Sequence, residues 1–167
     1  MTGEQRPPLD LLGEDAIDLG NATDFYILLQ AIDEAMPEDS VLVLEGDATA
    51  PAVAHFLRAH EPADRPELVA NSTGTYQVFH LPLAGDNLHR LRVLADACAA
   101  PEVAFHLMVY RGDEVLLWAH DAGDGSLLLA RSLPDETLER MRSVLGDSLR
   151  PHVTYGLFGW LRRSRQH

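Results

Sequence analysis

The sequence contains no lysine, a single cysteine, and no apolar run near the roughly 20 residues that a membrane-spanning helix needs. Cys98 alone cannot form a disulfide within the chain. Residues 1–12 lack the apolar segment of a secretory signal. Apolar residues nevertheless make up 46% of the 167 positions, which is enough for one domain with a core. Together these features predict a folded cytoplasmic protein.

The familiar catalytic signatures are also missing. The sequence has no phosphate-binding glycine loop, no Cys-x-x-Cys, no His-Glu-x-x-His and no Gly-x-Ser-x-Gly. Residues 121–125 superficially resemble a calcium loop, but they lack the alternating oxygen ligands and the distal glutamate, so we expect a hairpin turn there. No cofactor is predicted. Enzymatic activity is left open, and the absence of these motifs disfavours it.

Charge is distributed unevenly along the chain. All 13 basic residues are arginine, a bias typical of G+C-rich, bacterial-type genomes, and 26 acidic residues give a net charge of −13. Residues 150–167 carry four arginines and no acid, so residues 1–149 have a net charge of −17. Direct nucleic-acid binding needs clustered bases and is disfavoured. The acidic body either serves solubility or meets a basic protein partner.

Apolar periodicity predicts the helices. Phe25, Leu28, Leu29, Ile32 and Met36 recur at helical spacing and form one stripe. Similar stripes follow along the chain, each bounded by proline, glycine or a capping aspartate. The predicted helices span about 24–36, 50–60, 87–99 and 134–146.

Short apolar runs between turn residues predict the strands. Residues 41–44, Val-Leu-Val-Leu, have no polar face, as expected of a central strand buried on both sides. Glycine-containing turns near 112 and 123 separate the last three strands into a meander. The predicted strands span about 41–44, 68–70, 75–81, 103–111, 114–121 and 126–131.

This order predicts an α+β fold. After the first helix, the first six elements match the ferredoxin-like, split β-α-β sandwich, which a C-terminal β-meander and a final helix extend. The 41–44 strand would be central and lie beside the 103–111 strand, and the first and last helices would cover the second face. We expect residues 1–22 to form a flexible leader, 23–149 a single domain, and 150–167 a C-terminal tail.

The predicted topology gathers polar residues at one edge of the sheet. Glu45 and Asp47 would end the first strand there, His106 would begin the fourth, and His120 and Asp121 would end the fifth. Imidazole and carboxylate groups are metal ligands, so this edge is a candidate metal or ligand site. A two-residue turn at 112–113 argues against such a site, because it places His106 and His120 on opposite faces of the sheet unless a bulge intervenes. The alternative is a capped edge with hydrogen-bonded histidines.

The tail combines aromatic residues with arginine, the types enriched at binding hot spots. Tyr155, Phe158, Trp160, Arg162 and Arg163 are therefore candidate partner-binding residues. A weak contact with a membrane surface is a less favoured alternative. The plainer interpretation is a segment that folds back with Trp160 in the core and its arginines paired with the acidic body.

Two hypotheses of function follow. The first is a small acidic protein-binding module of the adaptor, regulator or toxin-neutralising type, supported by the charge distribution and the tail. The second is a small metal- or ligand-dependent enzyme that uses the polar edge. The sequence favours the first, and it identifies neither the partner nor the oligomeric state.

Overall fold

A computed structural model describes residues 12–13, 15–64, 76–121 and 126–151. The described helices are α2 (Phe25–Ala35), α3 (Pro51–Ala59), α5 (Asn87–Ala95) and α6 (Asp135–Leu145), with short 3-10 turns at Ala100–Glu102 and Gly146–Ser148. The described strands are β1 (Ile17–Ala22), β2 (Val41–Gly46), β3 (Gln77–Pro82), β4 (His106–Arg111), β5 (Glu114–His120), β6 (Ser126–Leu129) and β7 (Leu149–Arg150). The predicted α+β class is confirmed.

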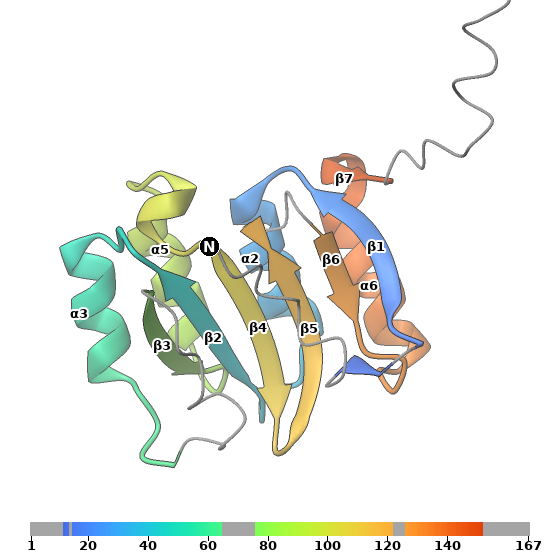
Figure 1. Cartoon of the computed structure of the whole chain (residues 1–167), viewed down its shortest axis with the longest axis horizontal. Coiled ribbons are helices and arrows are strands. Elements are labelled where there is room, and N and C mark those ends of the chain that lie inside the picture. The colour runs from blue at the N-terminus through green and yellow to red at the C-terminus, as the bar shows by residue number, and fades with distance from the viewer. Residues whose placement is uncertain (1–11, 14, 65–75, 122–125, 152–167) are drawn as a thin grey trace, which may run out of the picture.

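The seven strands form one antiparallel sheet in the order β3-β2-β4-β5-β6-β1-β7 (Figure 1). Strand β2 is central between β3 and β4, and hairpins extend the sheet from β4 through β5 to β6, as predicted. The predicted strand at 68–70 lies outside the described residues. The ferredoxin-like arrangement, which requires that strand, is therefore not confirmed.

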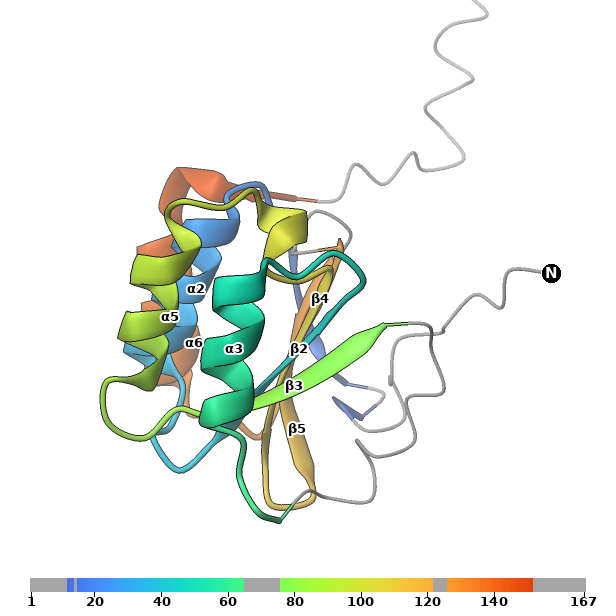
Figure 2. The same cartoon turned by 90° about the vertical axis from the view of Figure 1, so that its left-hand side faces the viewer.

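The four described helices form one layer on a single face of the sheet (Figure 2). Helix α2 packs beside both α5 and α6, and α3 packs beside α5. The prediction that the first and last helices cover the second face is wrong. Apolar residues on both faces of a meander indicate that both faces are buried, but they do not say by what. Among the described residues, no helix is both long and apolar enough to cross a membrane.

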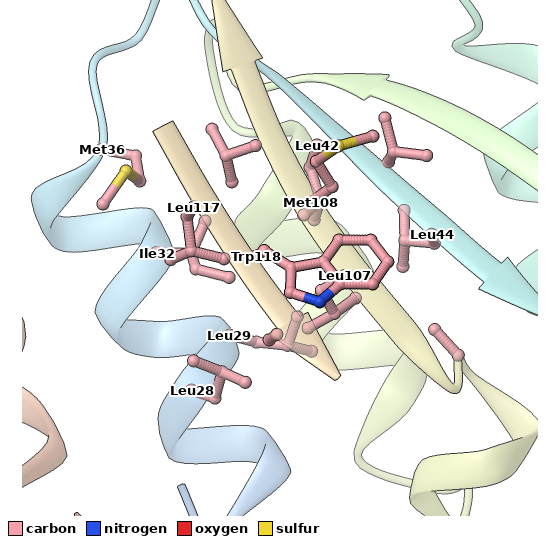
Figure 3. Packing of buried hydrophobic residues seen from close by; sticks show 14 of the residues in the cluster. Leu28, Leu29, Ile32, Met36, Leu42, Leu44, Leu107, Met108, Leu117 and Trp118 are labelled. Atoms are coloured by element: carbon pink, nitrogen blue, oxygen red, sulfur yellow. The ribbon is translucent and has the colours of Figure 1, made fainter. Parts of the chain in front are cut away.

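Helix α2 supplies the centre of the core. The side chain of Asp24 accepts hydrogen bonds from the backbone N–H groups of Tyr26 and Ile27 and so caps the helix. Leu28, Leu29 and Ile32 lie on the side of α2 that faces the sheet (Figure 3), and all three are fully buried. Every second residue of the neighbouring strands faces the helices, and these residues are also fully buried. They are Leu42, Leu44, Leu81, Leu107, Val109, Leu117, Ala119, Leu127 and Leu129. Burying each leucine contributes about 1.5–3 kcal/mol.

Residues 17–22, expected in a flexible leader, form strand β1 between β6 and β7. The strand is irregular, because its register against β6 shifts between Asp18 and Gly20. Asp18 accepts a hydrogen bond from the Gly20 N–H at 2.7 Å, and Gly20 has a φ of 92°. Aspartate, glycine and asparagine are depleted in strands, which is why the segment has the composition of a loop.

Gly20→Ala tests the close approach of β1 to β7. A Cβ at Gly20 would meet the backbone of Arg150 and Pro151, whereas a Cβ at Gly85 would meet nothing, although Gly85 also has a positive φ of 70°. Left-handed strain alone should make Gly85→Ala cost about 1–2 kcal/mol. Gly20→Ala should cost roughly 2 kcal/mol more, because the backbones must separate. Urea unfolding of both variants measures the difference, and equal losses would contradict the close approach of the two backbones.

Candidate functional site

An extra residue in β5 sets the geometry of the polar edge. Val109 pairs with Leu117 but Tyr110 pairs with Val115, so Leu116 is inserted as a bulge. With the bulge, Leu107 pairs with Ala119, and His106 lies opposite His120 on the same face of the sheet. The two-residue turn at 112–113 is present, as expected. The register inferred from it, with the two histidines on opposite faces, is wrong because of the bulge.

His106, His120 and Asp121 form a cluster whose candidate ligand atoms all lie within 4.8 Å of one another. The rings of the two histidines are 4.7 Å apart between centroids. The backbone N–H of Asp121 donates to Nδ1 of His106 at 3.3 Å, and Nδ1 of His120 lies 3.1 Å from Oδ2 of Asp121. Asp121 has a φ of 50°, a conformation that aspartate tolerates better than most residues. The cluster thus joins the start of β4 to the end of β5, at the upper edge of the sheet in Figure 1.

Aromatic rings surround His106 and fix its position. Its imidazole stacks on Trp118 at 5.7 Å with an interplanar angle of 18°, and the ring of Tyr76 approaches edge-on at 5.7 Å. His106 is buried, whereas the side chains of His120 and Asp121 are 36% and 57% exposed. The cluster therefore has one buried member and two that solvent can reach.

Burial and the neighbouring histidine affect the protonation of His106. Its pKa is lowered, first because burial disfavours the imidazolium and then because His120 repels it, while Asp121 acts in the opposite direction. The neutral imidazole, the form that can accept a hydrogen bond or a metal ion, is thereby favoured.

Glu45 is a buried acidic residue on the strand next to the cluster. It lies directly opposite His106 across the β2–β4 pair and is 93% buried, since only 7% of its surface is exposed. Its side chain forms no hydrogen bond or ion pair with any residue in the described part of the chain. Burial raises its pKa above the ordinary value of 4.5.

Asp47, the fifth predicted member of the edge, is not part of the cluster. Strand β2 ends at Gly46, and Asp47 is an exposed residue of the loop that follows. The structure therefore brings together three of the five predicted residues, His106, His120 and Asp121, and Glu45 pairs with His106 from the neighbouring strand. Chemically, two imidazoles and a carboxylate can bind a cation.

A second surface feature is a groove between α2 and α5. It has a volume of about 430 Å³, and Tyr26, Ile27 and Val93 supply its apolar lining. Among the described residues, Tyr26 and Val93 are the exposed large hydrophobic side chains, at 36% and 64%. Arg92 in the groove is paired with Asp33 at 2.9 Å.

The groove could have been detected in the sequence but was missed. Val93 lies off the apolar stripe formed by Leu88, Leu91 and Leu94, and Tyr26 lies off the stripe of its own helix. An apolar residue on the polar face of an amphipathic helix signals an exposed contact. Each of these two residues is a weak indication by itself. Together they indicate a shared exposed surface only when α2 and α5 are known to be neighbours.

The predicted partner-binding residues of the tail, Tyr155, Phe158, Trp160, Arg162 and Arg163, lie outside the described residues. Their role stays a prediction.

Comparison of the chain with protein-family models, with curated proteins and with solved structures finds no match.

Glu45→Gln should stabilise the chelator-treated protein increasingly as the pH rises. Because the folded-state pKa of Glu45 is raised, the folded protein loses stability as the pH rises through that pKa, whereas below 4.5 the carboxyl is protonated in both states. Glutamine cannot ionise, so the gain in melting temperature over wild type should be larger at pH 7 than at pH 4. Glu38→Gln, at an exposed position, serves as the control. A gain that does not change with pH would refute the buried, unpaired carboxylate.

Proposed function

We propose that the protein is a small acidic protein-binding module that docks a basic partner through the groove between α2 and α5. The observation that carries the proposal is that Tyr26 and Val93, the exposed large hydrophobics of the described residues, line the same groove. Contiguous exposed apolar surface marks interaction sites more often than scattered single residues do. An apolar side chain of the partner would fill the groove.

Charge supports a basic partner. Two acidic residues, Asp24 and Asp96, border the groove, and the arginine there is already paired with Asp33. The net charge of −17 over residues 1–149 extends the acidic field beyond the groove. Such a field accelerates encounter with a basic partner and suppresses acidic ones, and salt weakens its effect.

The tail offers a further contact in this proposal. Thr23, next to Asp24 of the groove, donates from its backbone N–H and its hydroxyl to the carbonyl of Ser148. Residues 149–150 then pair with β1. Residues 152–167 lie outside the described residues, and we propose that their aromatic and arginine side chains add to the interface with the partner.

A second candidate function is a small metal- or ligand-dependent enzyme that uses the polar edge. The observation that favours it is the cluster of His106, His120 and Asp121, with the buried residue Glu45 paired with His106 on the neighbouring strand.

Val93→Asp should weaken partner binding without unfolding the domain, because residue 93 is largely exposed. Immobilised full-length protein is compared with this variant in pull-downs from native lysate, and retained proteins are identified by mass spectrometry. A partner retained by wild type should be reduced at least ~10-fold by Val93→Asp, as for an interface hot spot. Ser143→Asp, an added charge on the surface between α2 and α6, is the matched control and should retain the partner.

A chain truncated after Pro151 tests the contribution of the tail. A partner lost by both the truncated chain and Val93→Asp would indicate one interface formed by groove and tail. A partner lost only on truncation, with Val93→Asp behaving as wild type, would contradict docking in the groove. Raising the salt concentration should weaken a genuine complex, because opposite charges contribute to it.

A further inference from the structure

We propose that His106, His120 and Asp121 form a binding site for a divalent transition-metal ion of the zinc class. Their candidate ligand atoms already lie within 4.8 Å of one another. Imidazole nitrogen and carboxylate oxygen bind zinc at about 2.0–2.2 Å, which puts two ligands of a tetrahedral ion roughly 3.3–3.6 Å apart. Small side-chain rotations would close the remaining gap.

The three side chains suit a site that a metal ion can enter. His106 is buried and held by Trp118, so one ligand is already oriented. His120 and Asp121 are more than a third exposed and can adjust around an ion arriving from solvent. Rotamer freedom is thus lost at only two of the three ligands when the ion binds.

The hydrogen bonds of the cluster do not decide between a metal site and a capped sheet edge. The contacts from His106 to the Asp121 N–H and from His120 to the Asp121 carboxylate fit either interpretation. They could simply satisfy two histidines at the end of a hairpin.

Glu45 is the independent observation that favours a cation. The residue is 93% buried, it faces the same side of the sheet as His106, and its carboxyl forms no hydrogen bond or ion pair with another described residue. Burying a carboxylate without a counter-charge is costly. A cation bound by the adjacent cluster would offset the cost of burying an ionised Glu45, which without a cation is more favourably buried in its neutral form.

The number of ligands indicates an accessible metal ion. Three protein ligands leave one position of a tetrahedral ion for water or for a ligand molecule, as in zinc sites that are open to solvent. The exposed sides of His120 and Asp121 lie where such a molecule would approach. The inference requires only the polar edge and is independent of the groove between α2 and α5.

Zinc titration of the full chain tests the proposal. The protein is purified without a histidine tag, treated with chelator, and titrated with Zn²⁺ by isothermal calorimetry. We expect one high-affinity Zn²⁺ per chain, and His120→Ala or Asp121→Asn should weaken binding at least ~10-fold because each removes a ligand. Asparagine tolerates the positive φ at position 121, so that variant preserves the backbone. His89→Ala, a histidine of α5 outside the cluster, should bind as wild type does. Glu45→Gln should weaken binding several-fold.

Trp118 reports where the ion binds. Cu²⁺ quenches nearby tryptophans, and Trp118 stacks on His106, so in a Trp160→Phe background Cu²⁺ should quench the remaining emission saturably. His120→Ala should remove this quenching. Absence of zinc binding would overturn the proposal. Zinc binding that is unchanged in His120→Ala, or that occurs without quenching by Cu²⁺, would place the ion elsewhere and would overturn it too.

Discussion

The residue that β5 inserts opposite Tyr110 decides which side chains face which layer of the domain. Strand side chains alternate, so a pairing shifted by one residue exchanges the two faces of everything downstream. Here β6 pairs with β5 and β1 pairs with β6, so the register of β5 determines which residues of both strands face the helices. With the bulge, Leu117, Leu127 and Leu129 face the helices. The same insertion brings His120 to the face of His106, so core packing and the polar cluster depend on one extra residue.

Strand β2 connects the core to the cluster. Leu42 and Leu44 point into the helical layer, and Glu45 occupies the opposite face one residue later. Glu45 lies between Val78 of β3 and His106 of β4, and the residue is 93% buried. The central position that makes β2 a good core strand therefore also gives its terminal acid an unusual environment.

The sequence predicted the elements whose pattern is local. The stripe from Phe25 to Ile32 predicted α2 nearly to the residue, and the unbroken apolar run at 41–44 correctly predicted a central strand. Strand β1 was missed because Asp18 and Gly20 form a bulge, and their types resemble a turn. A strand defined by its neighbours rather than by its own alternation leaves little local signal.

The candidate site was predictable in its residues but not in its geometry. Topology alone brought Glu45, His106 and His120 to one edge. Residues 115–118 are all apolar, so no alternation shows where the extra residue of β5 lies, and the faces of the histidines could not be assigned. The second face was misassigned for a related reason, since apolar side chains show that a face is covered but do not identify what covers it.

The irregularity of β1 has a consequence for how the protein behaves at high concentration. Among the described residues, β1 pairs with β7 only at Asn21 and Ala22, so the outer side of Ile17–Gly20 is near the rim of the sheet. A regular rim strand is a template on which another copy can add a strand and start aggregation. The bulge, the left-handed conformation of Gly20 and the charge of Asp18 make pairing with such an added strand less favourable. The features that make this strand hard to recognise in the sequence thus also make this rim of the sheet a poorer template for another strand.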